Sequence, residues 1–161
     1  MPLQARNPHD DGEPGPDDAD FVPGGHDGPL LTEIDHVAIA VDDLGAAIDY
    51  YRDTFGALVE HREIVDSDGV EEAMLKVAES YIQLLTPTRD DSPVAKYLEK
   101  RGEGLHHIGY RVEDCAVALQ AVKDQGGRVL DDQPRPGSRG TTVAFIHPKG
   151  AFGTLIELVQ E

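Results

Sequence analysis

The chain has 161 residues, of which 39% are hydrophobic, and it carries a formal net charge of −17 at pH 7. This length suits one domain with a real core, and the strong negative charge argues against nucleic acid as a partner and against simple electrostatic capture of an anionic ligand. No apolar run has the length of a membrane span, no signal peptide is recognised, and a single cysteine excludes an internal disulfide. We therefore expect a cytoplasmic protein with no membrane partner.

Residues 1–30 are rich in proline, glycine and aspartate, and Arg6 is their one lysine or arginine. They contain too few apolar side chains to form a core, so we expect a disordered acidic extension. His9 and His26 lie within it and are not expected to bind a metal. Residues 31–161 are expected to form a single domain.

The first half of this domain, 31–86, shows both strand-like and helical patterns. Its first strand, 34–41, reads Ile-Asp-His-Val-Ala-Ile-Ala-Val and carries His36. Apolar residues at helical spacing behind two aspartates predict a helix over 44–55 that ends at Gly56. Alternating patterns then predict strands at 57–63, 70–77 and 81–85.

The second half, 104–161, is expected to repeat this order after a connector at 87–103. In the connector, Ser92 is the expected N-cap of a short helix and Pro93 its first residue. Cys115 lies on the apolar side of the next helix and is expected to be an inert core residue. The repeated elements are predicted at 105–112, 115–124, 128–131, 141–146 and 154–159.

The two halves are related by an internal duplication. His36 precedes Val41 by the same interval as His107 precedes Val112, and the helix that follows keeps the same offset. A single repeat of this length indicates two similar modules rather than a solenoid. On the face of 105–112 that carries His107, Gly109 has no side chain, which suits a close approach of another group to the backbone.

Four polar side chains fall on the strand faces opposite the helices: His36, Gln83, His107 and Glu157. If each module curls its sheet around a shared cavity, a pseudo-twofold axis brings these side chains together. Two imidazoles, an amide oxygen and a carboxylate suit a divalent ion of octahedral preference and do not suit a closed structural zinc site. In the alternative interpretation, Gln83 and Glu157 cap local strands and the histidines have no joint role.

Several short motifs carry a resemblance to a known family. They are Ile-Asp-His-Val-Ala at 34–38, Tyr-Tyr-Arg-Asp-Thr-Phe-Gly at 50–56, Gly-Leu-His-His at 104–107, His-Pro-Lys at 147–149 and Leu-Ile-Glu-Leu at 155–158. With them, the chain resembles the vicinal oxygen chelate superfamily and, within it, the methylmalonyl-CoA epimerase family. The resemblance implies an α+β fold in which tandem βαβββ modules form a curved mixed sheet around a metal-binding cavity, with helices on the outer face.

The resemblance also implies roles for particular residues. The metal ligands would be His36, Gln83, His107 and Glu157, and Glu72 would be a catalytic carboxylate outside the ligand set. The implied reaction is epimerisation of methylmalonyl-CoA at C2 through an enolate, with Glu72 and Glu157 as bases on opposite faces. A divalent ion such as cobalt or manganese and a homodimer are implied as well.

Other members of the superfamily supply alternatives. The substrate could be a homologous acyl-CoA such as ethylmalonyl-CoA. A lactoylglutathione lyase of the glyoxalase I type usually has glutamate in the position of Gln83, an extradiol dioxygenase uses two histidines and a glutamate, and an antibiotic-binding module lacks the ligands. Arg111 and Lys149 either hold the substrate carboxylate or coenzyme A phosphates or are solvated surface charges, and His106 and His147 are expected to be structural.

Overall fold

The computed structural model describes residues 28–161, so the predictions for 1–27, including those on His9 and His26, lie outside the described residues. In chain order the elements are β1 (Leu31–Ala40), α1 (Leu44–Phe55), β2 (Val59–Val65), β3 (Val70–Val77), β4 (Ser80–Pro87), α2 (Pro93–Arg101), β5 (Gly104–Val112), α3 (Cys115–Asp124), β6 (Arg135–Pro136), η2 (Ser138–Gly140), β7 (Thr142–Ile146), η3 (Pro148–Gly150) and β8 (Ile156–Gln160). No helix in this part of the chain is both long enough and apolar enough to cross a membrane.

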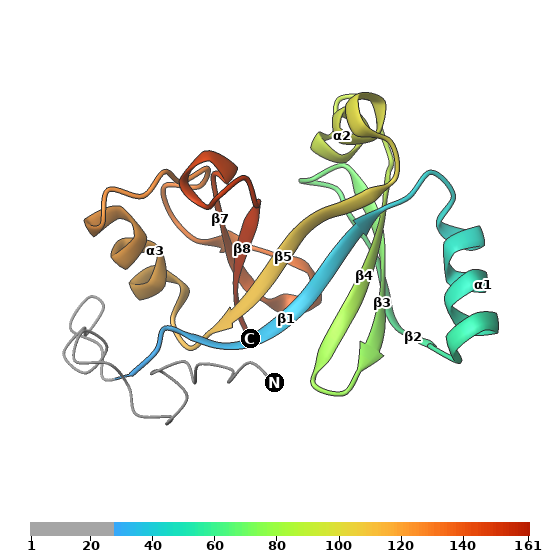
Figure 1. Cartoon of the computed structure of the whole chain (residues 1–161), viewed down its shortest axis with the longest axis horizontal. Helices are drawn as coiled ribbons and strands as arrows, with labels where there is room; N and C mark the ends of the chain where they lie inside the picture. The colour runs from blue at the N-terminus through green and yellow to red at the C-terminus, as the bar shows by residue number, and fades with distance from the viewer. Residues whose placement is uncertain (1–27) are drawn as a thin grey trace, which may run out of the picture.

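Within residues 28–161 all the strands form one sheet in the order β2-β3-β4-β1-β5-β8-β7-β6. At its centre β1 and β5 pair antiparallel, and each pairs on its other side with a parallel strand of its own module, β4 or β8. The sheet curves strongly between the modules, and α1 and α3 lie on its outer side (Figure 1). This arrangement confirms the predicted α+β fold of two βαβββ modules with outer helices.

Each module helix has a side-chain cap and an apolar face against the sheet. Asp43 accepts a hydrogen bond from Ala46 N at 2.9 Å at the start of α1, and Asp114 caps α3 through Val117 N at 3.0 Å. The cluster under α1 consists of Val41, Leu44, Ala73, Leu75 and Leu84. The cluster under α3 consists of Val112, Cys115, Ala118, Leu119, Ala144, Ile146 and Leu158.

Cys115 is a fully buried core residue, as expected. Burial raises the pKa of its thiol to about 11, with further increases from nearby carboxylates, so the thiolate is scarce at neutral pH. The apolar faces of α1 and α3 therefore pack against the outer side of the sheet, and polar groups occupy its inner face.

The prediction of a strand at 128–131 is wrong. Within it only Val129 forms a β-bridge, to Ile146, and the short strand β6 lies further along the chain. The Asp131 carboxylate accepts a hydrogen bond from Phe145 N at 2.8 Å. A side chain thus pairs with this backbone N–H of β7, where a neighbouring strand would offer a carbonyl. Elsewhere the predicted elements exist and their ends differ by a few residues.

Candidate active site

Two rows of residues, paired across neighbouring strands, cross the centre of the sheet and form the floor of the site. In the first row, Gln83 on β4, Ala38 on β1 and His107 on β5 are partners. Partners on neighbouring strands point to the same face. Ala38 is fully buried and small, so it leaves space between the two longer side chains.

The second row joins His36 on β1, Gly109 on β5 and Glu157 on β8. Here the small central residue is a glycine, and a Cβ on it would lie 2.2 Å from His36 Cε1. The imidazole of His36 therefore passes directly over the Gly109 backbone towards Glu157. This is the close approach that the sequence predicted at Gly109.

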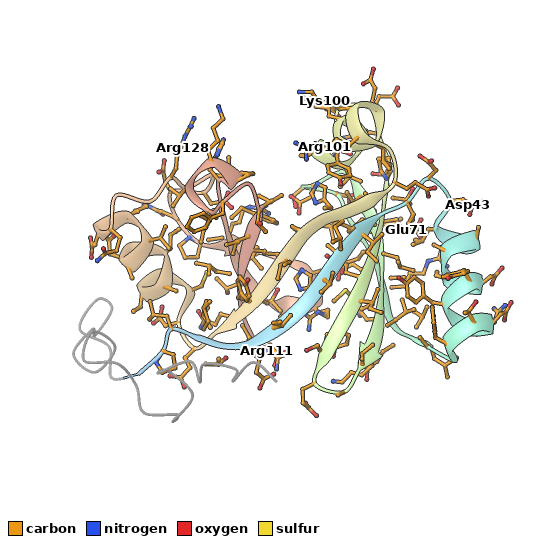
Figure 2. The ribbon with its side chains drawn as sticks, viewed as in Figure 1. Asp43, Glu71, Lys100, Arg101, Arg111 and Arg128 are labelled. Carbon is orange, nitrogen blue, oxygen red and sulfur yellow. The ribbon has the colours of Figure 1, made fainter. Side chains whose placement is uncertain are left out.

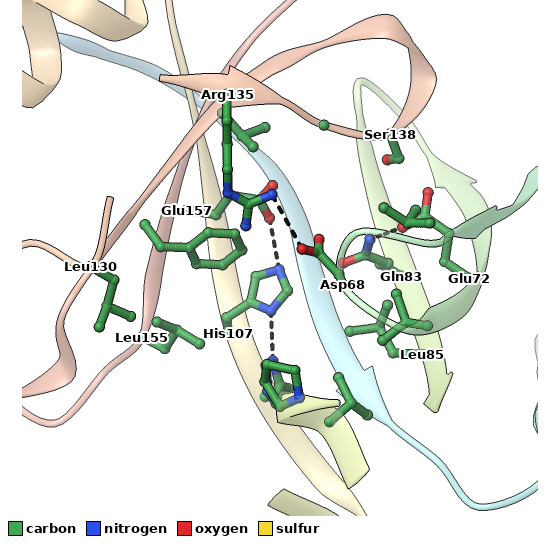
Figure 3. Close-up of a pocket in the computed structure, with 18 of the residues that line it drawn as sticks. Asp68, Glu72, Gln83, Leu85, His107, Leu130, Arg135, Ser138, Leu155 and Glu157 are labelled. Carbon is green, nitrogen blue, oxygen red and sulfur yellow. Dashed lines mark hydrogen bonds and ion pairs between the residues drawn. The ribbon is translucent and has the colours of Figure 1, made fainter. Parts of the chain in front are cut away.

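The side chains of His36, His107 and Glu157 meet at one point. His36 Nε2 lies 3.0 Å from both His107 Nε2 and Glu157 Oε2, and His107 Nε2 lies 2.8 Å from the same oxygen. Figure 3 shows the contact between His107 and Glu157. Three metal-ligating atoms that face one another in this way can hold a single metal ion.

The two histidines differ in their electrostatics. Burial opposes the charged form of His36, but hydrogen bonds with Asp35 and Glu157 outweigh it and raise its pKa to about 9. Burial lowers the pKa of His107. Burial also opposes the charged form of Glu157, yet its hydrogen bonds with both histidines hold its pKa far below the ordinary value. Glu157 is therefore ionised at neutral pH, as a carboxylate ligand must be.

Asp35 occupies a β-bulge in β1 and orients His36. The register with β5 shifts between Ile34 and His36, which leaves Asp35 without a partner strand residue. The fully buried carboxylate lies 2.7 Å from His36 Nδ1, and it accepts hydrogen bonds from Arg111 at 2.9 Å and Arg139 at 2.7 Å. A neutral His36 that donates Nδ1–H to Asp35 has its lone pair on Nε2, towards the cluster.

The second module has a bulge at the equivalent place. Ala38 pairs with His107 and Ile39 pairs with Leu105, so His106 is an extra residue of β5 without a partner in β1. His106 Nδ1 lies 2.8 Å from His107 Nδ1, so it contacts His107 as Asp35 contacts His36. Burial and the charge of His107 lower the pKa of His106 to about 4. We expected His106 to be structural, and the structure places its ring in the wall of the cavity beside a candidate ligand.

Glu72 and Gln83 belong to the first module and contact each other. Glu72 is 2% exposed, and Gln83 Nε2 donates a hydrogen bond to Glu72 Oε2. The remaining oxygens, Glu72 Oε1 and Gln83 Oε1, are buried and have no partner among residues 28–161. Burial raises the pKa of Glu72 against the opposing effects of the neighbouring Ser138 and Gln83 side chains. Buried oxygens without partners are rare in proteins, so both are open to a ligand.

These groups line a cavity of about 180 Å³. Glu72 and Gln83 lie on one side of it, and His107 and Glu157 lie on the other (Figure 3). The rest of the wall includes the apolar side chains Val65, Val70, Leu85, Val94, Val143 and Phe145. An apolar cavity with a few convergent polar groups is typical of a binding site for a small molecule.

The donor set fits a divalent cation. His36, His107 and Glu157 supply two imidazoles and an ionised carboxylate, and Gln83 Oε1 is an uncommitted amide oxygen in the same cavity. Borderline metal ions accept such mixed nitrogen and oxygen ligands. Glu72, Gln83, His107 and Glu157 thus line one cavity, and His36 contacts the last two of them, which argues against separate local roles for these residues.

Sequence reasoning missed the buried ion-pair network behind His36. Arg111 is neither solvated nor free for a phosphate, because it pairs with Glu33, Asp35 and Glu161. Asp35 stands next to His36 in the sequence, but strict alternation places it on the opposite face, and only the bulge turns it inward. His147 accepts a hydrogen bond from Lys149 N at 3.0 Å and so caps the short turn η3.

Two βαβββ modules that direct polar side chains towards one shared cavity define a protein of the vicinal oxygen chelate class. A family model described as "Glyoxalase/Bleomycin resistance protein/Dioxygenase superfamily" matches residues 35–145. The ethylmalonyl-CoA/methylmalonyl-CoA epimerase of Cereibacter sphaeroides is 41% identical over 133 residues, which cover 81% of this chain and 99% of that protein.

Solved structures agree with this similarity. A variant of Streptomyces coelicolor methylmalonyl-CoA epimerase, in complex with 2-nitronate-propionyl-CoA, superposes with a TM-score of 0.79 at 47% identity and covers 81% of this chain and 98% of that one. The methylmalonyl-CoA epimerase of Mycobacterium tuberculosis superposes with a TM-score of 0.80 at 41% identity, covering 84% and 91%. The chain belongs to the glyoxalase/bleomycin resistance/dioxygenase superfamily and, within it, to the methylmalonyl-CoA epimerase family.

Gly109→Ala should displace the His36 ring, because the new Cβ would overlap it at 2.2 Å. The imidazole would have to leave its place between Asp35 and Glu157, so we expect the affinity for Co²⁺ to fall roughly ten-fold or more. Isothermal titration calorimetry on metal-stripped protein measures this affinity. Gly45→Ala is the matched control, since its added Cβ meets its nearest neighbour at 3.5 Å. Wild-type affinity in Gly109→Ala would contradict the inferred contact.

Asp35→Asn should destabilise the metal-free protein, because it removes the fully buried anion that Arg111 and Arg139 share. Breaking a buried ion pair in this way costs about 3 kcal/mol of unfolding free energy. Urea denaturation followed by circular dichroism gives the change. The control is Asp49→Asn, which removes an exposed pair with Arg52 and should have a much smaller effect. Equal changes in the two variants would show that the network contributes little.

Proposed function

We propose that the protein is a divalent-metal-dependent epimerase that interconverts the 2R and 2S forms of methylmalonyl-CoA. The observation that carries this proposal is the pair of carboxylates, Glu72 and Glu157, which enter one small cavity from different modules. Inversion at C2 requires that a proton leave one face of the carbon and return to the other. One carboxylate for each face meets this requirement without a redox cofactor. The names of the similar epimerases support the choice of substrate.

Glu72 is suited to remove the C2 proton. Burial raises its pKa, so it binds a proton more strongly than an ordinary glutamate does. Gln83 holds Oε2 through its amide and thereby fixes the orientation of the carboxylate, while Oε1 has no partner in the described chain. Such a group, free of the ligand cluster and shielded from water, can exchange a proton with a bound substrate.

Glu157 is the proposed partner base on the opposite face. Its Oε2 contacts both histidines, whereas its Oε1 makes no hydrogen bond to residues of the described range. The depressed pKa of Glu157 makes it a weaker base than Glu72. The two carboxylates therefore differ in basicity, and each enantiomer of the substrate loses its C2 proton to a different one.

We further propose that His36, Gln83 through Oε1, His107 and Glu157 hold the metal. A bound divalent ion supplies Lewis-acid stabilisation for the negative charge that develops on the substrate when C2 loses its proton. The protein prepares this site by keeping Glu157 ionised and by directing the Nε2 atoms of both histidines to one point. Co²⁺ and Mn²⁺ accept these ligand types and are the ions to test first.

Ethylmalonyl-CoA is a second candidate substrate, because the Cereibacter sphaeroides relative is named for both esters. The two substrates differ by one methylene, and an apolar pocket discriminates such pairs by only about 1–3 kcal/mol. The ratio of their kcat/KM values, measured with the same preparation, decides which ester fits better.

Activity should depend on a metal ion. In deuterium oxide, the wild-type protein should place deuterium at C2 of methylmalonyl-CoA and interconvert its enantiomers. Treatment with a chelator should abolish both signals, and added Co²⁺ or Mn²⁺ should restore them, since metal-assisted charge stabilisation is worth several kcal/mol. Mass spectrometry and chiral analysis of the acyl group follow the reaction. Full activity in protein shown to be metal-free would overturn the proposed metal role.

Glu72→Gln should slow epimerisation by roughly 10²–10⁴-fold, the usual contribution of a positioned acid or base. Affinity for Co²⁺ should be unchanged, because Glu72 is not a proposed ligand, and one enantiomer should still exchange its C2 proton through Glu157. Glu71→Gln is the matched control: Glu71 is the next residue along β3 and pairs with Arg62 at 2.8 Å. Epimerisation at the wild-type rate in Glu72→Gln, or a larger loss in Glu71→Gln, would show the two-base assignment to be incorrect.

A further inference from the structure

The short turn η2 lies between β6 and β7 of the second module, and its central residue, Arg139, attaches it to the first module. The backbone N–H of Arg139 donates a hydrogen bond to Glu63 Oε2 on β2 at 3.1 Å. Its guanidinium donates to Asp35 on β1 at 2.7 Å and lies 4.8 Å from the ring centroid of Tyr81 on β4. One residue of the second module thus contacts three strands of the first.

These contacts hold Arg139 in a backbone conformation that an arginine seldom adopts. Its φ is 55°, in the left-handed region where glycine is the usual residue. Its side chain is only 13% exposed, whereas most arginine side chains in proteins lie in solvent. The contacts with the first module therefore offset an unfavourable local conformation, and the local backbone preference does not account for the residue.

The residue before Arg139 lies at the proposed base. Ser138 lines the cavity, and its side chain lies beside Glu72 (Figure 3). Thr141 closes the turn within its own module, since its hydroxyl and its backbone N–H donate to the Ser138 carbonyl at 2.7 and 3.0 Å. Arg139 connects this closed turn to the module that carries Glu72, and its backbone partner, Glu63, is the register partner of Glu72 in the sheet.

We propose that Arg139 is a positioning residue for the reaction: by connecting η2 to β1, β2 and β4, it fixes the wall of the cavity beside Glu72. This inference rests on the proposed function for the role of Glu72 as a base. One oxygen of Glu72 accepts a hydrogen bond from Gln83, and the other has no partner within residues 28–161, so the packing around the carboxylate decides how it lies. A displacement of about 1 Å in such a site can slow a reaction by roughly a hundred-fold.

Arg111 provides a matched comparison. It donates to the same Asp35 carboxylate at 2.9 Å, so loss of either arginine removes one positive charge from behind His36. Within the described part of the chain, no hydrogen bond or salt bridge joins Arg111 directly to η2. Figure 2 shows Arg111 beside β1, at the end of the molecule opposite α2. Arg111→Gln and Arg139→Gln therefore make the same change of charge at Asp35 and differ in their effect on η2.

The test measures loss of the C2 proton from each enantiomer of methylmalonyl-CoA separately, in deuterium oxide, with saturating substrate and metal-loaded protein. The enantiomer whose exchange disappears in Glu72→Gln is the one that reacts with Glu72. In Arg139→Gln we expect exchange of this enantiomer to be slower by roughly ten- to a hundred-fold than in Arg111→Gln, and exchange of the other enantiomer to match. Arg111→Gln should change both enantiomers by the same factor, because it acts through Asp35 and His36. Calorimetric affinity for Co²⁺ should change equally in the two variants.

A second measurement does not depend on activity. The amides of Arg139 and Thr141 are hydrogen-bonded in η2, so mass spectrometry should show faster amide hydrogen exchange over residues 138–143 in Arg139→Gln and wild-type exchange in Arg111→Gln. Circular dichroism checks the fold of each variant. Arg139→Lys keeps the charge opposite Asp35 without the planar guanidinium, and it should give an intermediate effect on both readouts.

These readouts separate the inference from the proposed function. Equal slowing of both enantiomers in Arg139→Gln, or amide exchange in η2 that stays at the wild-type rate, would overturn the positioning role. Faster amide exchange in Arg139→Gln together with selective slowing of the Glu72 enantiomer would support it. If η2 loosens as expected but the wild-type protein exchanges no C2 proton, the connection between Arg139 and η2 stands and the proposed function fails.

Discussion

The site depends on two small residues at the centre of the sheet. Ala38 and Gly109 occupy equivalent positions in β1 and β5, and each lies between two long polar side chains of its row. A side chain on Gly109 would overlap the ring of His36, and the small Ala38 leaves space between Gln83 and His107. Because β1 and β5 run antiparallel through both rows, the modules contribute the proposed ligands from opposite directions. Neither module holds a complete site alone, which gives the duplication a chemical reason as well as a structural one.

Periodicity explains how much of this was predictable from the sequence. Helical spacing behind Asp43 and Asp114 marks α1 and α3, and alternation assigns Gln83 and Glu157 to the inner face, because both patterns reflect burial of one side of an element. The two bulges break that alternation, so no period-two rule could turn Asp35 or His106 inward. The contact of Arg139 with Asp35 joins residues far apart in the sequence, and Arg139 reaches it from a turn where its own φ is 55°. Short-range patterns carry no signal for such a contact.

The bulges of the two modules have the same geometry, but their bulge residues differ in charge. Asp35 and His106 are equivalent bulge residues, and each contacts Nδ1 of the histidine that follows it. In the first copy the contact is an anion, offset by Arg111 and Arg139, and in the second it is an imidazole whose pKa is lowered to about 4. His36 therefore meets a fixed negative charge and His107 a neutral ring. Two histidines with the same role in the cluster thus differ in basicity, and an imidazole supported by a carboxylate is the stronger donor to a cation.

Charge also links the cavity to the rest of the surface. The cavity is lined by Asp68, Glu72, Asp131 and Glu157 against one arginine, Arg135, so an anionic substrate meets like charges there unless a cation occupies the ligand cluster. The net charge of −17 adds a repulsion that acts at longer range. At physiological ionic strength, however, exposed charges farther apart than about 8 Å are largely screened. The acidic surface then influences approach, whereas the bound substrate experiences mainly the charges that touch it. A metal ion held by the proposed ligand cluster would therefore be the main positive charge that such a substrate meets in the cavity.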